Sequence, residues 1–598
     1  MIRQTINKLA QLLTTQERRR GYLLLSMIML MAILDMVGVA SILPFMAVLS
    51  SPEIVETNRY LALVYNELGF IGKESFLFFL GFSFFIVLIF SIVFKALTSY
   101  ALMRFTQMRN YSLSRRMVAD YLSQPYDWFL NRHSADIGKT VLSEVAQVIN
   151  GALIPLLQLI SNSLVVVTLL VLLMLVDFKL TLIVAACLGG TYTFIYFLIR
   201  RYMSSLGEVQ VNANRERFHV VQEVFGAIKD IKVAGLEKES LHRYEIPAKK
   251  YANGEATAQI VSLIPRYILE IIVFGGMLLV MLYMMRNPDG LQGALPTMSV
   301  YAFAGYKLMP ALQQVYAQLS RMRFAGPALE VLYNDMSTLQ AVNHSNADNE
   351  ESMMGLSTKI RLSDVSYSYP NTEQLALNNC SLEIQVNTTV GFVGTTGAGK
   401  TTAIDVILGL LRPKGGSLWV DEEEITAINI RSWQRSIGYV PQHIYLSDDS
   451  VAANIAFGVP KARVSIAAVE QAAKLASLHD FVIQEMPEGY DTLVGERGVR
   501  LSGGQRQRIG IARALYHDPA VLIFDEATSA LDNLTEQSVM KAISTLSHRK
   551  TIIMIAHRLS TVKECDKIFF LEHGNVVESG TYDELLLNNN KFKSMSAL

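Results

Sequence analysis

The residues with the clearest chemistry lie in a glycine-rich stretch of this 598-residue chain. Two glycines bracket four residues, and Lys400 and a hydroxyl follow directly. Glycines let backbone N–H groups close around phosphate oxygens, Lys400 places a charge on the β- and γ-phosphates, and Thr401 can ligate Mg²⁺. Apolar residues at 391–393 predict a strand and those at 403–408 a helix, so the phosphates would lie at a helix N-terminus. The predicted triphosphate site consists of Gly394, Thr395, Thr396, Gly397, Ala398, Gly399, Lys400, Thr401 and Thr402.

A pair of carboxylates, Asp525 and Glu526, follows an apolar run at 521–524. Such a run is typical of a buried parallel strand, and α/β proteins place ligands at the carboxyl ends of these strands. Downstream of a phosphate loop, Asp525 is expected to hold Mg²⁺ and Glu526 to polarise the attacking water. The alternative is a solvated acidic pair with no chemistry.

The elements that must position these residues begin near residue 358, where strands and helices alternate as in an α/β domain with a mostly parallel sheet. The chain is 51% hydrophobic, but the apolar residues concentrate in its first half. A net charge of zero gives no indication of a nucleic-acid partner. We expect an amphipathic interfacial helix at 1–20, a transmembrane domain at 21–336, a linker at 337–357 and a nucleotide-binding domain at 358–598.

Six apolar segments are long enough to cross a hydrocarbon core about 30 Å thick. They lie near residues 22–49, 76–103, 153–176, 180–199, 260–285 and 298–315. The loops 104–139 and 200–251 are rich in Lys and Arg, so both loops, the N-terminus and the nucleotide-binding domain are expected in the cytoplasm. Both loops are polar enough to extend the helices well beyond the membrane. The first apolar run is too long for a signal peptide, so we expect it to be retained.

Further motifs show that residues 358–598 resemble the ATP-binding cassette proteins. Residues 501–505 match their signature peptide, shortly before the carboxylate strand. The resemblance implies that Tyr369 stacks on adenine, that Gln442 contacts Mg²⁺ beside Thr401 and Asp525, and that His557 assists Glu526 in catalysis. Residues 529–532 resemble the D-loop of the same family. The signature residues expected to contact ATP are Ser502, Gly503, Gly504 and Gln505.

Six spans ahead of one cassette resemble the exporter-type half-transporters of this family. The implied fold is a membrane bundle of six transmembrane helices followed by an α/β P-loop ATPase domain. In such proteins the signature of one subunit closes over the nucleotide on the P-loop of the other. Because Glu526 and the signature are both intact, the resemblance favours a homodimer.

The transported substrate is indicated by three basic residues inside the predicted spans: Lys95, Arg266 and Lys307. A charge within a span costs about 2.5–3.5 kcal/mol on insertion scales and is usually functional. The three side chains either line a cavity for an anionic headgroup, or snorkel or pair with a neighbour such as Glu270. In a headgroup cavity Arg266 is expected to matter most, because only its guanidinium forms a fork with phosphate oxygens.

The membrane half also resembles flippases for lipid-linked oligosaccharides of bacterial protein N-glycosylation. The resemblance rests on residues 35–45, 262–270 and 306–310, and on the insert 51–69, which resembles a short external helix. It implies an ATP-driven translocase for a polyprenyl-diphosphate-linked oligosaccharide or similar anionic glycolipid in the bacterial inner membrane. Lys95 and Lys307 stand where arginine is expected, which keeps the charge but loses bidentate phosphate binding. The alternatives are an exporter of drugs, lipid A or peptides, and an ATP-gated channel or regulator.

Overall fold

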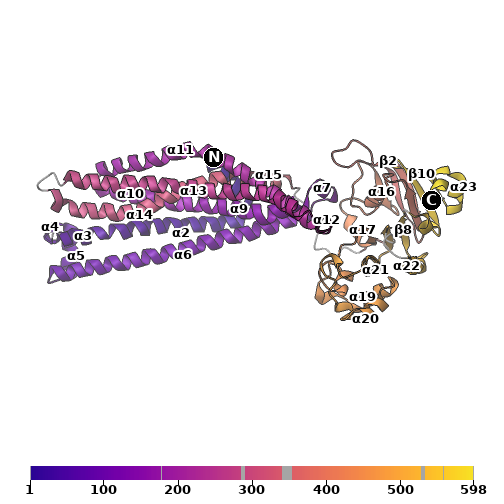
Figure 1. Cartoon of the computed structure of the whole chain (residues 1–598). Helices are drawn as coiled ribbons and strands as arrows, with labels where there is room; N and C mark the ends of the chain where they lie inside the picture. The colour runs from indigo at the N-terminus through magenta and orange to yellow at the C-terminus, as the bar shows by residue number, and fades with distance from the viewer. Residues whose placement is uncertain are drawn as a thin grey trace. The chain divides into compact units, whose positions relative to one another are not determined.

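The structure is a computed structural model that describes residues 2–50, 52–176, 178–284, 290–339, 353–526, 533–556 and 558–596. The chain forms two compact units. The helical unit comprises Met1–Gln124 and Arg132–Val342, and the α/β unit comprises Pro125–Asn131 and Asn343–Leu598. Figure 1 labels the helices and strands of both units.

Two sheets form the core of the α/β unit. The larger sheet has the strand order β10-β9-β3-β8-β7-β6 and is parallel except for the β10–β9 pair, which confirms the mostly parallel sheet. Its strands are β3 (Thr389–Gly394), β6 (Ile437–Val440), β7 (Val521–Asp525), β8 (Thr551–Ile555), β9 (Lys567–Glu572) and β10 (Asn575–Gly580). The second sheet is antiparallel, in the order β2-β1-β4-β5, and was not predicted. Its strands are β1 (Lys359–Tyr367), β2 (Leu377–Gln385), β4 (Gly415–Val420) and β5 (Glu423–Glu424).

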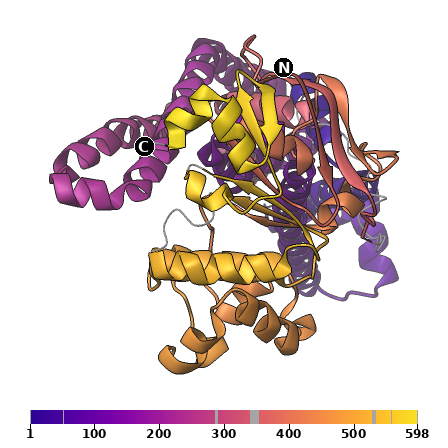
Figure 2. The ribbon, with the colours of Figure 1, turned by 90° about the vertical axis from the view of Figure 1, so that its right-hand side faces the viewer.

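Helices cover the larger sheet and form a separate lobe of the α/β unit. The helices are α7 (Tyr126–Leu130), α16 (Lys400–Ile407), α17 (Ile430–Arg435), α18 (Val451–Ile455), α19 (Ile466–Leu475), α20 (His479–Glu485), α21 (Gly503–Leu515), α22 (Asn533–Leu546), α23 (Tyr582–Asn588) and α24 (Asn590–Ser596). In Figure 2, α18, α19 and α20 gather in the orange lobe beside the strands. The fully buried strands β3, β7 and β8 read as continuous apolar runs because both faces of a parallel sheet are covered.

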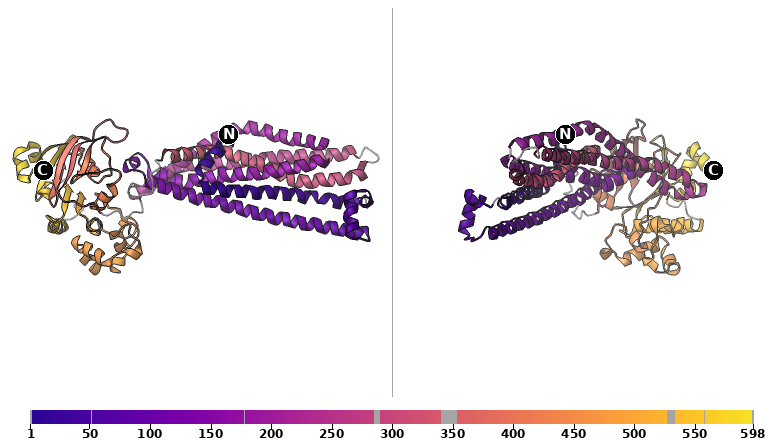
Figure 3. Two further views of the ribbon diagram at one scale, coloured as in Figure 1. Left: turned by 180° about the vertical axis from the view of Figure 1, so that it is seen from behind. Right: turned by 60° about the vertical axis from the view of Figure 1, so that its left-hand side comes forward.

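Long helices make up the helical unit. They are α2 (Thr15–Ala40), α3 (Ile42–Ser50), α6 (Lys73–Leu122), α10 (Ile154–Val176), α11 (Phe178–Gly226), α13 (Glu237–Met284) and α14 (Gly290–Phe324). Shorter helices are α1 (Ile2–Leu12), α4 (Ile54–Thr57), α5 (Arg59–Glu67), α8 (Ser134–Lys139), α9 (Val145–Val148), α12 (Ile228–Ala234) and α15 (Gly326–Thr338), with π-helical turns at Thr140–Glu144 and Ile149–Leu153. Helices α4 and α5 confirm the helix predicted in the insert, and Figure 3 shows them together between α3 and α6.

Four helical paths among the described residues are long and apolar enough to cross a membrane: Thr15–Leu49, Lys73–Leu122, Ser134–Val176 and Thr181–Gly226. They coincide with the first four predicted spans. The fifth and sixth predicted spans fall on α13 and α14, although residue 285 lies outside the described residues. Helix α6 has 50 residues, which makes it about 75 Å long at the usual helical rise. This length confirms that the helix continues past the predicted span into the basic loop.

The N-terminal segment 1–20 is not one helix, because the chain breaks between α1 and α2. The Thr14 hydroxyl accepts a hydrogen bond from the Glu17 N–H, and the Glu17 carboxylate accepts one from the Thr14 N–H at 2.8 Å. This reciprocal pair is a capping box, which starts a new helix at Thr15. Leu9 and Leu12 of α1 are 4% and 5% exposed, so part of its apolar face packs on protein.

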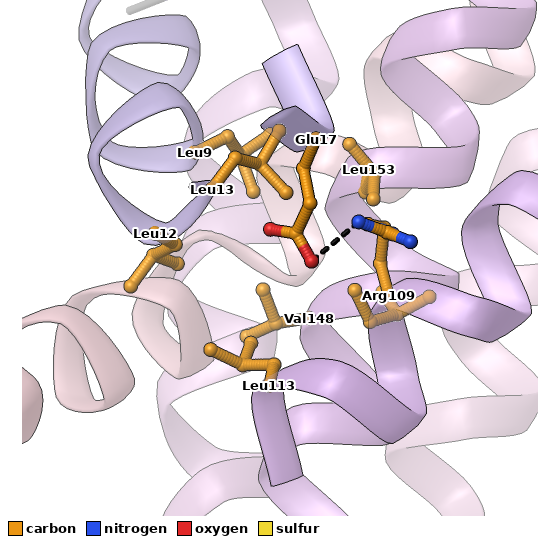
Figure 4. A pocket seen from close by; sticks show the side chains of 9 residues that line it. Leu9, Leu12, Leu13, Glu17, Arg109, Leu113, Val148 and Leu153 are labelled. Carbon is orange, nitrogen blue, oxygen red and sulfur yellow. Dashed lines mark ion pairs between the residues drawn. The ribbon is translucent and has the colours of Figure 1, made fainter. Parts of the chain in front are cut away.

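A buried ion pair between Glu17 and Arg109 lies next to this break, among leucines of three helices (Figure 4). The Glu17 carboxylate also accepts a hydrogen bond from the Ser112 hydroxyl at 2.7 Å. The side chains of Glu17 and Arg109 are 10% and 8% exposed. Because the pair joins α2 to α6 beside α1, it fixes how the N-terminal helices meet the bundle.

Arg109→Met should destabilise the helical unit by about 3–5 kcal/mol, because it leaves the Glu17 carboxylate buried without its cation. The double variant Glu17→Gln/Arg109→Met removes both charges and should regain a large part of that loss. Thermal unfolding of the full chain in detergent measures the difference. Equal melting temperatures for the single variant and the unaltered protein would contradict the structural role of this pair.

Candidate functional site

The glycine-rich loop follows β3 in the interior of the larger sheet. Gly397 and Gly399 have φ of +79° and +97°, a region that glycine adopts at no steric cost. A Cβ on Gly399 would lie 2.6 Å from the carbonyl oxygen of Ala376, so the loop also requires a close backbone approach. Helix α16 begins at Lys400 with no side-chain cap on its first N–H groups. Uncapped N–H groups at a helix N-terminus bind phosphate well.

The Lys400 side chain is buried in this loop, at 6% exposure. Its Nζ donates to the carbonyl oxygens of Gly394 at 2.7 Å and Thr395 at 3.1 Å. Burial lowers the pKa of Lys400, and the negative charges of Glu526 and Asp525 oppose that decrease. A phosphate next to the ammonium would offset the electrostatic cost of burying this cation.

The predicted carboxylates lie at the carboxyl end of β7. Val440 of β6 pairs with Phe524, and Asp525 pairs with Ile555 of β8, all in parallel register. The carboxyl ends of the three strands therefore meet at one edge of the sheet, where α/β proteins bind ligands. Asp525 is buried at 7% exposure, and Glu526 has a φ of +50° that turns the chain out of the strand.

Two side chains from the end of β6 hold these carboxylates. The Gln442 amide Nε2 donates to Glu526 Oε2 at 2.7 Å. The Tyr439 hydroxyl donates to Asp525 Oδ2 at 3.4 Å. The predicted residues Gln442, Asp525 and Glu526 are thus brought together at this edge of the sheet. Tyr439 was not predicted, although it stands three residues before Gln442.

An aromatic side chain lies at the first turn of α16. The Tyr369 hydroxyl shares a hydrogen bond of 3.0 Å with the Thr402 hydroxyl. Its ring also meets the Tyr367 ring edge-on, with centroids 5.3 Å apart. These contacts hold Tyr369 next to the phosphate loop.

The signature residues form the start of α21. The Ser502 hydroxyl accepts from the Gln505 N–H at 3.2 Å, and the Gln505 Oε1 accepts from the Ser502 N–H at 2.8 Å. Gly503 and Gly504 are the first two residues of the helix. Among the described residues, the Ser502 and Gln505 side chains each accept from the other residue's backbone N–H and do not contact the P-loop. The other two predicted features, His557 and the segment 529–532, lie outside the described residues.

Comparison with known proteins identifies the family. Residues 377–529 match the profile described as ABC transporter, and residues 30–287 match that of the ABC transporter transmembrane region. The ATP-dependent lipid A-core flippase of Psychrobacter cryohalolentis is 31% identical over 491 residues, covering 81% of this chain and 80% of the flippase. The chain belongs to the ABC transporter family. A second ATP-dependent lipid A-core flippase, from Cupriavidus metallidurans, is 30% identical to the transporter over 481 residues, with 80% of each protein covered.

The transporter also shares the exporter fold. It matches the ATP-bound structure of a bacterial Atm1-family ABC exporter with a TM-score of 0.77 and 24% identity, over 97% of this chain and 98% of that one. The transporter is therefore a multi-pass membrane protein that binds ATP and couples its hydrolysis to transport. The buried Lys400 ammonium and the uncapped start of α16 fit the phosphates of ATP.

Two of the three basic residues predicted inside the membrane meet at one acid, Asp35 of α2. Lys307 Nζ of α14 lies 2.9 Å from Asp35 Oδ1, and Lys95 Nζ of α6 lies 3.6 Å from Asp35 Oδ2. The Ser91 hydroxyl donates to Asp35 Oδ1 at 3.0 Å. Asp35 is almost fully buried, whereas the Lys95 side chain is 56% exposed. Two lysines and one carboxylate leave the cluster with one net positive charge.

The third basic residue, Arg266 of α13, is held elsewhere. Its Nε lies 2.8 Å from Glu270 Oε1, one helical turn away, which is the pairing considered as the alternative above. Each of the three cations therefore has an acidic neighbour. The sequence does not connect Asp35 with Lys95 and Lys307, because the three residues come from different helices.

Asp405, on α16 five positions after Lys400, is a polar residue that the sequence analysis missed. Burial, together with the negative charge of Asp525, raises the pKa of Asp405 to about 6. A single acid within the apolar stretch 403–408 was the available signal. Asp421, after β4, behaves oppositely. Although partial burial raises its pKa, hydrogen bonds from the N–H groups of Lys359, Thr358 and Ser357 lower it to about 2.

Asp405→Asn should raise the melting temperature of the α/β unit at pH 8. The folded pKa of about 6 lies above the ordinary value of 3.8, so stability is lost as the pH rises between these values and the penalty is complete above pH 6. The gain should vanish below about pH 4. Scanning calorimetry of the full transporter in detergent, at pH 8 and below about pH 4, measures this change in melting temperature.

Asp421→Asn is the matched control, with the opposite sign. Its folded pKa of about 2 is below 3.8, so its stabilisation is present at pH 8 and lost as the pH falls through 2. This variant should melt at a lower temperature at pH 8. A loss of stability in both variants at pH 8 would contradict the electrostatic interpretation of Asp405.

Proposed function

We propose that this transporter is an ATP-driven flippase for a phosphorylated glycolipid of the bacterial inner membrane. The observation that carries the proposal is the Asp35 cluster, which keeps one net positive charge within the membrane-spanning helices. A charge within the membrane is costly, so its presence usually indicates a ligand site or a transport pathway. The Lys95 side chain, which is 56% exposed, is the part of the cluster that we propose meets an anionic headgroup.

The narrower substrate that we propose is a polyprenyl-diphosphate-linked oligosaccharide. Its diphosphate would supply the negative charge for Lys95, and Lys307 and Arg266 would add to the attraction. Lipid A is the second candidate, supported by the lipid A-core flippases among the relatives. Both lipids combine phosphate with sugar, so the same cluster suits either. An exporter of drugs or peptides is the remaining alternative.

We propose that the working protein is a homodimer. The Ser502 and Gln505 side chains cap each other's N–H groups, which leaves the N–H groups of Gly503 and Gly504 at the start of α21 for a ligand. In the proposed dimer they close over the nucleotide on the partner's P-loop. The proposed domains are an interfacial segment at 1–20, a transmembrane domain at 21–336, a linker at 337–357 and a cytoplasmic nucleotide-binding domain at 358–598.

For catalysis we propose that Asp525, Thr401 and Gln442 hold Mg²⁺, which when bound neutralises charge on the phosphates. Carboxylate, hydroxyl and amide oxygens are the hard donors that Mg²⁺ prefers. Tyr369 would stack on adenine and the P-loop residues 394–402 would bind the phosphates. Glu526, held by Gln442 at 2.7 Å, would orient the attacking water, and His557 would assist it in catalysis.

Glu526→Gln should lower ATP hydrolysis by about 10²–10⁴-fold, because it removes the general base but keeps the size of the side chain. ATP binding should survive, and the variant should accumulate as an ATP-bound dimer, detectable by size-exclusion chromatography with labelled nucleotide. Lys400→Ala is the control, because it should instead weaken nucleotide binding. Near-normal turnover of Glu526→Gln would refute the assignment.

Lys95→Gln should reduce flipping of a polyprenyl-diphosphate glycan in proteoliposomes while the melting temperature stays close to that of the unaltered protein. A neutral amide keeps hydrogen bonding but loses the Coulomb attraction, which is strong at low dielectric. Lys307→Gln should also destabilise the protein by about 3–5 kcal/mol, because Asp35 then lacks its closest cation. Arg266→Gln tests the third cation.

Assays with lipid A and with a hydrophobic drug separate the substrate alternatives. Loss of glycolipid flipping in Lys95→Gln with drug transport unchanged would favour the glycolipid. Unchanged flipping in the triple variant of Lys95, Arg266 and Lys307 would instead reject the headgroup role and favour a drug exporter.

A further inference from the structure

A second group of cations lines a solvent-open cavity of about 390 Å³ in the helical unit. This volume lies within the usual range for small-molecule sites, roughly 300–1,000 Å³. The cavity is separate from the Asp35 cluster, and none of its residues was predicted as a site. Its lining residues are Arg200, Arg201, Ser204, Ser205, Glu208 and Arg323.

The lining residues come from two helices that meet closely. Five of them follow one another at helical spacing on one face of α11, and Arg323 stands near the end of α14. Next to this face of α11, Met203 packs with Phe324. A Cβ on Gly207 would lie 2.1 Å from the Phe324 carbonyl oxygen, so only glycine lets the two backbones come this close. This contact brings Arg323 to the basic face of α11.

Aromatic residues one turn earlier on α11 hold the arginines. Arg323 Nε donates to the Tyr196 hydroxyl at 3.3 Å, and the Arg200 guanidinium lies 4.5 Å from the centre of the Phe197 ring. Within the described part of the chain, no ion pair joins any of the three guanidiniums to an acid. With Glu208 as the sole acid of the lining, the cavity carries two net positive charges.

The place of this cavity along α11 agrees with the level of lipid headgroups. Twenty helical residues span about 30 Å, the thickness of the hydrocarbon core. Arg200 and Arg201 come that far along α11 from residue 180, at the start of the loop expected in the cytoplasm. Basic pockets at this level between membrane helices bind phosphorylated headgroups.

We propose that this cavity binds the phosphate or diphosphate ester of a glycolipid in the inner leaflet, before translocation. The three guanidiniums supply forks for phosphate oxygens, the serine hydroxyls donate further hydrogen bonds, and the Glu208 carboxylate accepts from sugar hydroxyls. The cavity thus differs from the Asp35 cluster, which holds only ammonium groups. This inference rests on the proposed function, because it assumes that the ligand of the cavity is the glycolipid that the transporter moves.

The test is equilibrium binding of a fluorescent farnesyl diphosphate to the full-length transporter in neutral phosphatidylcholine nanodiscs. The variant Arg200→Gln/Arg201→Gln/Arg323→Gln should weaken binding about tenfold or more, because each charge-assisted hydrogen bond to phosphate is lost. Arg321→Gln is the matched control, an exposed arginine two residues away on α14 that does not line the cavity. It should bind as the unaltered protein does. Arg323→Lys, which keeps the charge but loses the fork, should fall between them.

Unchanged binding in the triple variant would overturn the proposal. Inorganic diphosphate distinguishes the two sources of the anion: if it competes as strongly as the prenyl ester, the site takes free anions and the lipid assignment is rejected. Thermal unfolding checks folding, and if the triple variant does not fold, Arg201→Gln and Arg323→Lys decide in its place. Glycolipid flipping in proteoliposomes separates the two proposals. Binding through the cavity without any flipping would refute the proposed function alone, whereas normal flipping by the triple variant would refute the cavity alone.

Discussion

Parallel pairing of β3, β8, β7 and β6 is the constraint on which the ATP site depends. In a parallel sheet all strands end at the same edge, so residues far apart in the chain arrive there together. Lys400 follows β3, Gln442 follows β6, and Asp525 and Glu526 end β7. The covering helices bury β3, β7 and β8 on both faces, and the parallel register of β6 with β7 brings Gln442 within 2.7 Å of Glu526.

The helical unit obeys a different constraint, the cost of charge at low dielectric. At two helix junctions among the described residues a carboxylate faces cations: Glu17 joins α2 to α6, and Asp35 joins α2 to both α6 and α14. Such pairs tie helices together, because removing one partner leaves the other charge unsatisfied. In the proposed cavity near residue 200, at the expected end of the hydrocarbon core, water and headgroups would take the place of a paired acid.

The sequence was most informative where function dictates local residue types. The strand–loop–helix around Lys400 and the carboxylates after β7 follow from spacing alone. Pairings across the fold were not predictable: Asp35 lies 272 positions from Lys307, and the hydrophobic pattern does not tell which helices meet. The break after α1 was missed because the capping box of Thr14 and Glu17 falls within a continuous helical pattern. The antiparallel sheet was missed because β1 and β2 alternate burial irregularly, with register shifts between them.

The close approach of Gly207 to Phe324 has a mechanical consequence. If two closely packed backbones part, they leave a void that costs free energy, so this point is a close-packed contact between α11 and α14. Close packing at this point would therefore resist changes in the separation between Arg323 and the arginines of α11. A ligand in the cavity would then move together with α11 and α14. Its release would depend on a change in the environment around the cavity and not on a widening of the cavity.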